Sequence, residues 1–288
     1  TAAGSNIELN SASNAFASEV TMQAGTGSNV AFGNIAFVDS EAVKLHSSAG
    51  ANGDLFIDGS TDGAVGGNLS ITATTGNITQ GIALAVTGTS SLVTSGQGAT
   101  IDLTTTTNAF TGELLITTND NNTPADGTYA AHASIDGGTT NLIIGTSTID
   151  GNLTLLSGGT ITDTASSTVT VKGDLNATTD ANNSNITLDG LEVSGAYILD
   201  PHGTGIVTIV NAAGIDFVAM TVDGALSATA TTGNITQSGA LTITGTTTLI
   251  TSADNATITL NDAGNAFTGK LLITTNDTGS ETDGDVEI

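Results

Sequence analysis

Apolar and polar residues alternate in short segments along the chain, and turn-forming residues separate these segments. The alternation is clear at 69–71, 101–103 and 114–117. A period of two residues places one face of a strand toward a core and the other toward solvent. Gly, Asn and Asp lie between the segments, as at Gly76-Asn77. Because no stretch combines a helical period with a helix cap, the pattern predicts an all-β protein with almost no α-helix.

The chain also contains a long internal duplication. Residues 67–120 and 224–277 match without a gap at 36 of 54 positions. Duplication on this scale is the signature of a repeat architecture. A Gly-x-Leu phrase recurs at Gly67, Gly151 and Gly224 and divides the chain further. We therefore expect one continuous solenoid built from a partial module at 1–66, modules at 67–150 and 151–223, and a truncated module at 224–288.

Two all-β architectures fit short strands that recur about every ten residues: a parallel β-helix, and a string of immunoglobulin-like sandwiches. Aromatic residues make up 3% of the chain and Trp is absent, whereas sandwiches commonly centre on large aromatic residues. Asn77 and Asn108 recur as Asn234 and Asn265, and such residues can stack in hydrogen-bonded ladders along a solenoid. Modules of unequal length are also tolerated by the turns of a solenoid. The sequence thus favours the parallel β-helix.

The alternation assigns an inward-facing set to each copy of the duplication. In the first copy it is Leu69, Ile71, Ile78, Leu84, Val86, Leu92, Ile101, Leu103, Phe110 and Ile116. In the second copy it is Leu226, Ala228, Ile235, Leu241, Ile243, Leu249, Ile258, Leu260, Phe267 and Ile273. Stacked coils would bury these residues in one narrow core.

The charge balance is strongly acidic. Asp and Glu together number 28, against three lysines and no arginine, which gives a net charge of −25. Contacts to phosphate need Lys and Arg, so we expect no nucleic-acid partner and no binding to anionic membrane surfaces. No apolar stretch approaches the ~18 residues of a membrane span, so we expect no membrane insertion. A lyase for acidic polysaccharides is disfavoured by the same lack of basic residues.

Catalytic patterns are not found. Without cysteine there is no disulfide, thiolate metal site or cysteine nucleophile. His46, His132 and His202 are isolated, with no spacing typical of a zinc site. No Gly-x-Ser-x-Gly elbow lies between a strand and a helix. We therefore predict that the protein is not an enzyme, and we assign no catalytic, cofactor-binding or metal-binding residues.

Calcium is the one cofactor that the sequence leaves open. Oxygen ligands in flexible loops suit Ca²⁺. The acidic and amide groups concerned are Asn119, Asp120, Asn121, Asn122 and Asp126; Asn276, Asp277, Glu281, Asp283 and Asp285; and Asp58 and Asp62. None of these groups matches the EF-hand loop or the nonapeptide Ca²⁺ repeat. Turn chemistry alone explains Asp and Asn in such places.

The repeat phrases resemble a known family. GNLSITATTGNITQ at 67–80, TGTTTLIT at 244–251 and ATITLNDAGNAFTGKLLIT at 256–274 resemble the repeats of filamentous haemagglutinin-like large exoproteins, the passengers of bacterial two-partner secretion. The resemblance implies a right-handed parallel β-helix fibre, exported through an outer-membrane transporter and displayed at the cell surface or released. It carries no catalytic residues over. The family's amino-terminal secretion domain is not evident in this sequence, so the transporter rests on analogy.

These observations together predict a structural or adhesive segment of an extracellular bacterial surface fibre, associated with the outer membrane. Its partners would be copies of itself, neighbouring repeats of the same polypeptide, or a glycan or protein receptor at a cell surface. Recognition would lie in the divergent loops Thr118–Thr140 and Leu188–Gly205. The chain opens inside a recognisable repeat, which favours a piece of a longer polypeptide or of a filament.

Three alternatives stay open. The chain could be a filament or sheath subunit that self-associates through exposed coil ends. It could be a β-helix that binds or acts on carbohydrate. Thr-x-Thr phrases, as at Thr242-Ile243-Thr244, could also form a flat array that binds ice, although Thr is common in strands for its β-propensity alone.

Overall fold

The computed structural model describes residues 5–16, 19–23, 33–46, 55–58, 64–120, 129–276 and 284–288. In these residues every regular element is a β-strand, and there is no helix of the length and apolarity that a membrane span needs. The chain divides into two compact units, Thr1–Gly151 and Asn152–Ile288. Each unit is described separately below.

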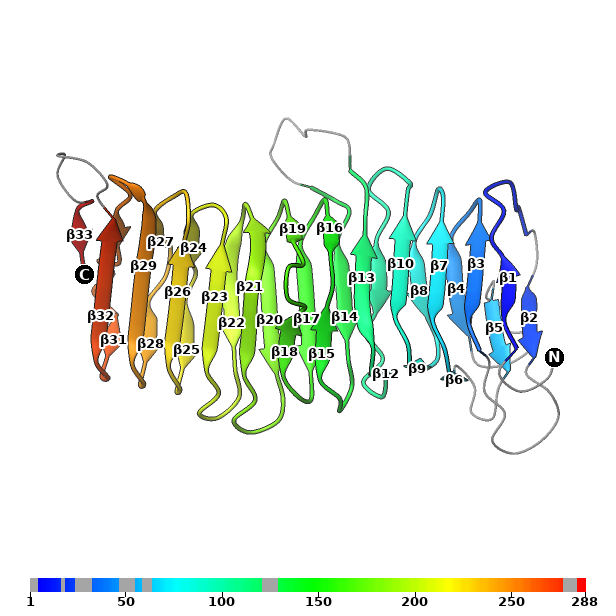
Figure 1. Ribbon diagram of the computed structural model, residues 1–288, viewed down its shortest axis with the longest axis horizontal. Coiled ribbons are helices and arrows are strands. Elements are labelled where there is room, and N and C mark those ends of the chain that lie inside the picture. Colours follow the sequence, from blue (N-terminus) through cyan, green and yellow to red (C-terminus); the bar gives the residue numbers. More distant parts are fainter. Residues whose placement is uncertain are drawn as a thin grey trace. The chain divides into compact units, whose positions relative to one another are not determined.

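The first unit has three sheets (Figure 1). Its front sheet contains, in spatial order, β1 (Ile7–Leu9), β3 (Ile35–Asp39), β7 (Leu69–Ala73), β10 (Ser90–Thr94), β13 (Glu113–Thr117) and β15 (Leu142–Ile144), with β16 (Ser147–Ile149) also paired to β13. Its back sheet contains β2 (Val20–Gln23), β5 (Leu55–Asp58), β4 (Val43–His46), β8 (Ile78–Gln80), β11 (Ile101–Leu103) and β14 (Ala133–Asp136). Its side sheet contains β6 (Ala64–Val65), β9 (Ala85–Val86) and β12 (Ala109–Phe110).

The second unit repeats this arrangement. Its front sheet contains β18 (Ile161–Asp163), β21 (Ile186–Val193), β23 (Val207–Asn211), β26 (Leu226–Ala230), β29 (Thr247–Asp254) and β32 (Leu271–Asn276), with β19 (Val169–Val171) also paired to β21. Its back sheet contains β17 (Leu153–Ser157), β20 (Leu175–Thr179), β22 (Ala196–Asp200), β24 (Ile215–Phe217), β27 (Ile235–Gln237), β30 (Ile258–Thr259) and β33 (Val286–Glu287). Its side sheet contains β25 (Met220–Val222), β28 (Leu241–Ile243) and β31 (Ala266–Phe267).

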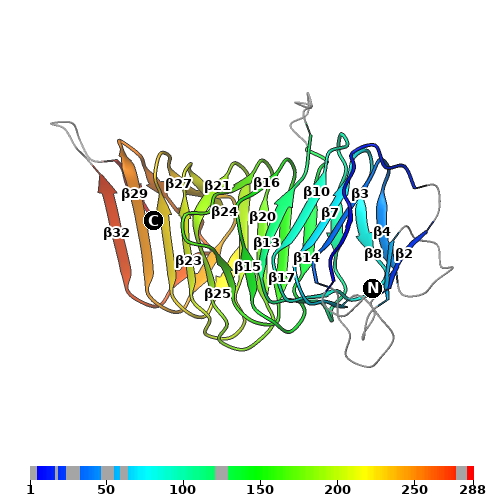
Figure 2. The ribbon, with the colours of Figure 1, turned by 45° about the vertical axis from the view of Figure 1, so that its right-hand side comes forward.

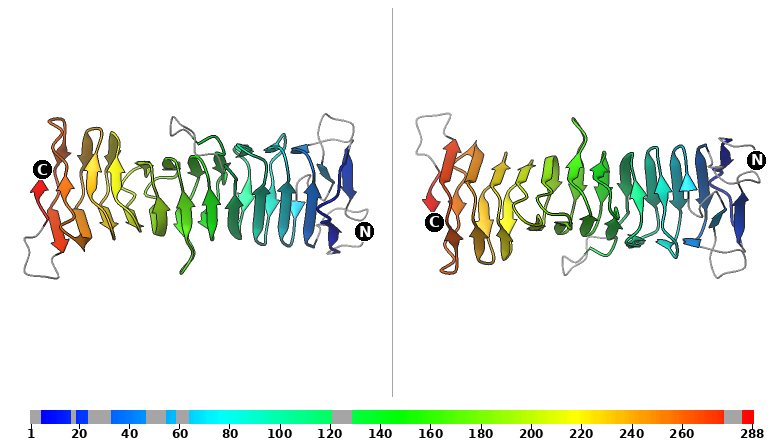
Figure 3. Two further views of the ribbon diagram at one scale, coloured as in Figure 1. Left: turned by 90° about the horizontal axis from the view of Figure 1, so that it is seen from above. Right: turned by 90° about the horizontal axis from the view of Figure 1, so that it is seen from below.

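Where a side sheet is present, the chain passes from front to back to side sheet and then begins the next coil. In the second unit, β26, β27 and β28 form one such coil and β29, β30 and β31 form the next. Strands of successive coils pair in parallel and in register, as Leu226 does with Thr247 and Ile235 with Ile258. Figures 2 and 3 show the strands of each unit stacked side by side. Tandem immunoglobulin-like sandwiches are built from antiparallel strands, so the parallel pairing confirms the predicted β-helix.

The core is the narrow space that the inward faces of the strands enclose. All ten inward residues predicted for the first copy are buried, and so are eight of the ten predicted for the second. Phe267 and Ile273 are exceptions, because each is only half-buried. They lie on β31 and β32, which among the described strands are outermost in their sheets and have a paired neighbour on one side only. Burial of an inward residue therefore depends on a coil stacked on both sides.

One stretch predicted as a divergent loop is mostly strand. The range Leu188–Gly205 contains all of β21 except its first two residues, and all of β22, so the prediction of a loop was wrong there. Leu191, Val193 and Tyr197 point into the core and are buried. The Asp189-Gly190 pair, which reads as a turn in the sequence, lies at a shift of register within β21. The other range, Thr118–Thr140, includes β14, and its residues 121–128 lie outside the described residues.

Glycine forms a column at the corner that leads into the front sheet. In the second unit Gly224, Gly245 and Gly269 occupy this corner in three successive coils, and the amide of Gly245 donates to the carbonyl of Gly224 at 3.0 Å. A Cβ at Gly245 would lie 2.5 Å from the carbonyl carbon of Gly224, closer than van der Waals contact permits. The corner thus requires glycine because the backbones of adjacent coils touch.

Candidate functional site

Asparagines at the coil corners each accept a hydrogen bond from the next coil. The Oδ1 atom of Asn77 accepts from the amide of Thr100 at 2.9 Å, and its duplicate Asn234 accepts from Thr257 at 2.8 Å. The same bond recurs along a second corner of the first unit, where Asn6, Asn34 and Asn68 accept from the amides of Asn34, Asn68 and Thr89. These side chains satisfy backbone donors that the turns leave unpaired. Each copy of the duplication thus makes this bond within its own unit.

A second duplicated feature is a reciprocal pair of side-chain amides. Gln80 Nε2 donates to Asn108 Oδ1 at 2.8 Å, and Asn108 Nδ2 donates to Gln80 Oε1 at 2.9 Å. Asn108 also accepts from the amide of Leu84 at 2.8 Å and donates to the carbonyls of Leu103 and Asp136. Asn108 is buried, so this network satisfies a polar group in the core. We call the Gln–Asn pair the amide clamp.

The second unit contains the same clamp. Gln237 and Asn265 exchange hydrogen bonds of 2.9 and 2.8 Å, and the amide of Leu241 donates to Asn265 at 2.9 Å. Sequence reasoning marked the two asparagines but missed the glutamines. The separation of 28 residues between Gln and Asn, kept in both copies, was the signal that could have found them.

The sequence LLITTND occurs twice, at 114–120 and at 271–277. The asparagine of each copy also bonds to the scaffold. Asn119 donates to the carbonyl of Ser95 at 2.9 Å, and Asn276 donates to that of Ser252 at 2.7 Å. Both asparagines were counted above as possible Ca²⁺ ligands. Their side chains instead tie one coil to the preceding one in both copies.

The acidic residues considered for Ca²⁺ do not form a cluster in the described residues. Within that part of the chain no group of three or more His, Asp or Glu side chains is arranged to hold a metal ion. Asp120 is buried, and its carboxylate accepts from the amide of Ala130 at 2.9 Å and from the Gln97 side chain. The amide of Asp120 donates to the carboxylate of Asp150 at 2.9 Å. Asp120 and Asp150 thus anchor the two ends of the segment between β13 and β17.

Several other calcium candidates lie outside the description. These are Asp62, Asn121, Asn122, Asp126, Asp277, Glu281 and Asp283, together with the side chain of Asp58. Asp285 belongs to the described residues, and its carbonyl accepts from the amide of Ile258 at 3.0 Å.

The histidines lie in different settings. His46 ends β4, with its side chain outside the description. His132 is half-buried just before β14, and His202 is exposed in the turn after β22. The amide of His202 donates to Thr179 Oγ1 at 3.1 Å, so the backbone of this residue helps to close a corner.

The pKa of the Asp163 carboxyl is shifted upward. Partial burial raises the pKa above its ordinary value of 3.8, and the nearby Asp189 carboxylate raises it further. Hydrogen bonds from the amides of Gly190, at 2.7 Å, and Asp189, at 3.1 Å, oppose the shift. The carboxylate thus bridges two coils at the irregularity in β21, which is a structural task.

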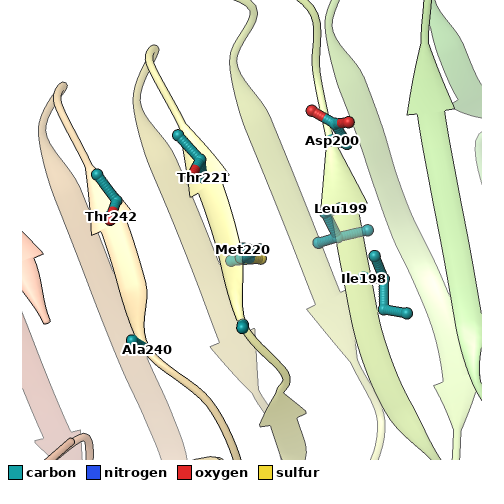
Figure 4. Close-up of a pocket in the computed structure, with 8 residues that line it drawn as sticks. Ile198, Leu199, Asp200, Met220, Thr221, Ala240 and Thr242 are labelled. Carbon is teal, nitrogen blue, oxygen red and sulfur yellow. The ribbon is translucent and has the colours of Figure 1, made fainter. Parts of the chain in front are cut away.

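A shallow depression lies beside the start of the side sheet in the second unit (Figure 4). Its volume is about 390 Å³, and its lining comes from β22, β25 and the segment that includes β28. Ile198 and Met220 supply apolar surface, while Asp200, Thr221 and Thr242 supply polar groups. One carboxylate and two hydroxyls in an open depression provide sites for weak contacts to a neutral sugar, but no general acid paired with a base.

The outward face of the front sheet carries no charge over the in-register part of four adjacent strands of the second unit. We call this the neutral face. It consists of two columns, Thr208, Ser227, Thr248 and Leu272, and Val210, Thr229, Ile250 and Thr274, in which neighbours pair directly across β23, β26, β29 and β32. The first unit has the same pattern on β3, β7, β10 and β13, with Ala36, Ser70, Ser91 and Leu115 in one column and Val38, Thr72, Val93 and Thr117 in the other.

Comparison with known proteins identifies a repeat family. No curated protein and no solved structure matches the chain. A family model described as repeats of unknown function matches residues 33–117, 130–197 and 204–274. The first and third of these ranges contain the strands from β3 to β13 and from β23 to β32. Since the matched ranges cover more than half of the sequence, the chain belongs to this family of repeats of unknown function (DUF5649).

Proposed function

We propose that the chain is a non-catalytic structural and adhesive segment of an extracellular bacterial surface fibre. The observation that carries the proposal is that the duplicated polar residues form hydrogen bonds between coils. The corner asparagines, the amide clamp and Asn119 with Asn276 make the same inter-coil bonds in both copies. A sequence that repeats its scaffold bonds is suited to extending a solenoid, since each added coil needs the same bonds.

The other elements of the proposal rest on charge and on the family resemblance. A net charge of −25 favours solubility outside the cell and disfavours nucleic acid and anionic lipid as partners. The resemblance to filamentous haemagglutinin-like exoproteins favours the cell surface or its surroundings as the location. Receptors would be a glycan or a protein of another cell, and neighbouring repeats would be further partners.

Immunogold electron microscopy of intact cells, with antibodies to this chain, tests location and form together. We expect label along thin surface fibres. Averaged images of these fibres should show an axial repeat of ~4.8 Å, the spacing of paired strands. Label confined to the cell interior would contradict the proposal. Binding of the purified chain to a glycan array and to cultured cells then separates adhesion from a purely structural role.

A filament or sheath subunit is the alternative that a specific observation favours. The neutral face offers a broad uncharged surface on an otherwise acidic chain, which suits contact between copies. Binding or processing of carbohydrate is the weaker alternative, and the depression beside Met220 is the place where it would be sought.

A further inference from the structure

The neutral face is distinguished from the other outward faces of the second unit by its width and its lack of charge. Two columns of four side chains cover it, and most of these side chains are half-buried by their neighbours. The back sheet presents the carboxylates of Asp200, Asp216 and Glu287 among its outward residues. The side sheet is uncharged but has one outward column only, formed by Thr221, Thr242 and Ala266.

Charged groups lie at the margins of the neutral face. Lys270 immediately precedes β32, and Asp254 ends β29 beyond a shift of register. On β21, the next strand in the sheet, Asp189 and Glu192 are exposed. A neutral centre with a charged rim is the usual anatomy of a protein interface.

The shape of the face also matches a flat partner. Val210, Thr229, Ile250 and Thr274 are all β-branched, so one column presents stiff, short side chains of similar height. Neighbouring side chains within each column lie at the spacing of paired strands, ~4.8 Å. A second copy carries the same spacing, so its columns can lie between these columns as in face-to-face packed sheets.

We propose that the neutral face is a lateral interface through which two copies of this chain pack sheet against sheet. The choice of partner follows from charge. Two chains of net charge −25 repel each other, and of the outward faces of the second unit this is the widest on which they can meet without bringing carboxylates together. A contact of this kind runs along the side of the solenoid and is independent of its ends.

The area predicts a weak contact. Four strands ~4.8 Å apart and about five residues of ~3.3 Å each cover about 300 Å² per copy. Stable interfaces bury about 800 Å² per partner. Association should therefore appear only at high protein concentration, and it should strengthen when salt screens the repulsion between the acidic chains.

Sedimentation velocity of the full chain tests the proposal. We expect the weight-average sedimentation coefficient to rise between about 10 µM and about 1 mM protein, and to rise more in about 1 M NaCl, where the Debye length falls to ~3 Å. Thr229→Glu, which places a carboxylate at the centre of the face, should abolish the rise. The matched control is Thr242→Glu, which adds the same charge at a half-buried outward threonine of the side sheet and should leave the rise intact.

A second measurement keeps the proposal testable if the glutamate variant does not fold. The chain has no cysteine, so Thr229→Cys and Thr242→Cys each provide a single site for a spin label. Face-to-face packing should give a shorter distance between copies for the label at position 229 than for the label at position 242. A chain that stays monomeric at about 1 mM in high salt overturns the proposal. Association that Thr229→Glu leaves intact, with equal label distances, also overturns it and points to other contacts, while the surface-fibre proposal would stand.

Discussion

Individual polar side chains in this protein act mainly as bonds between coils. Asn108 shows this most clearly, since one buried amide joins Gln80, Leu84, Leu103 and Asp136. Removing a partner from such a network leaves several buried groups unsatisfied, which costs more than the net gain from forming each bond. The equivalent Asn265 is half-buried, and its side chain bonds to Gln237, Leu241 and Leu260. The two asparagines therefore form a natural matched pair.

We expect Asn108→Ala to lower the free energy of local opening around β8 to β12 by about 3 kcal/mol or more, because buried donors and acceptors lose their partners. Asn265→Ala should cost clearly less. Hydrogen exchange followed by mass spectrometry measures both effects. Equal losses of protection in the two variants would contradict the explanation by burial.

Tyr197 is a residue whose polar group is not satisfied. Its ring is fully buried and lies 6.2 Å from the ring of Phe217, while its hydroxyl has no hydrogen-bond partner among the described residues. Tyr197→Phe should therefore keep or raise stability, by up to about 1 kcal/mol. Chemical denaturation at neutral pH measures the change, and a loss above about 1 kcal/mol would reveal a partner for the hydroxyl.

The same residue predicts a pH dependence. Burial raises the pKa of Tyr197 above its ordinary value of 10.0, so the unfolded chain releases this proton more readily than the folded chain. The contribution of this proton to the free energy of unfolding is fully present below pH 10.0. It is lost as the pH rises above 10.0, by about 1.4 kcal/mol per pH unit. Denaturation of the wild type and of Tyr197→Phe should therefore diverge between pH 9 and pH 11. Parallel curves would mean that the hydroxyl ionises normally in the folded state.

At the scale of elements, the corners set how closely the coils can stack. The strands supply the ladder and the apolar face, but the turn into the front sheet brings backbone onto backbone at Gly224 and Gly245. The family match also begins near this corner, at residues 33 and 204, directly before β3 and β23. Glycine at this place is thus a requirement of coil stacking.

We expect Gly245→Ala to destabilise the second unit by about 2 kcal/mol, because the new methyl group overlaps the carbonyl group of Gly224 and the corner must open. Gly264→Ala is the control, since its new Cβ would lie 3.0 Å from the Ala240 Cβ and 3.2 Å from the Asp262 side chain, with no backbone atom as close as at Gly245. Thermal melting compares the two variants. If both melt alike, close contact at the corner is not what selects glycine.

For the whole molecule, stability is a sum over neighbouring coils. Phe110 is fully buried in the first unit, whereas Phe267 is half-buried on the outermost strand of its side sheet. Phe110→Asp should cost about 4 kcal/mol or more, because it removes apolar burial and adds a buried charge. Phe267→Asp should cost less.

Hydrogen exchange also reports how far the damage at Phe110 extends. Protection should fall most in β9 and β12, and the loss should decline with each further coil toward β3. Wild-type protection in β9 and β12 would show that the residue contributes little to the core.

The charge of the whole chain predicts a dependence on salt. A net charge of −25 destabilises the compact state through self-repulsion, and salt screens that repulsion. The melting temperature should rise between low salt and about 0.5 M NaCl. CaCl₂ at the same ionic strength should give the same rise if screening is the only effect, and a further increase would favour a calcium site. A melting temperature independent of salt would show that the carboxylates are too far apart to matter.

The sequence by itself determined the all-β class, the parallel stacking of coils and most of the core. The period of two fixed which residues point inward, and the exact repetition of Asn77 and Asn108 as Asn234 and Asn265 favoured a solenoid. These features are local or repeat at fixed intervals, so they can be read without knowing which strands are neighbours.

Only the tertiary structure decided which partners the polar side chains bond to and which inward residues are fully buried. The partner of Asn108 is 28 residues away, and Phe267 is less buried because, in the part of the chain that the structure describes, no strand pairs on its far side. The sequence did not reveal the strands β21 and β22, because Asp-Gly is a typical turn pair. In the structure the pair at 189–190 lies within β21. The neutral face likewise exists only once the register aligns the outward residues of separate coils. Each of these properties depends on contacts between coils, which the order of residues along one strand does not contain.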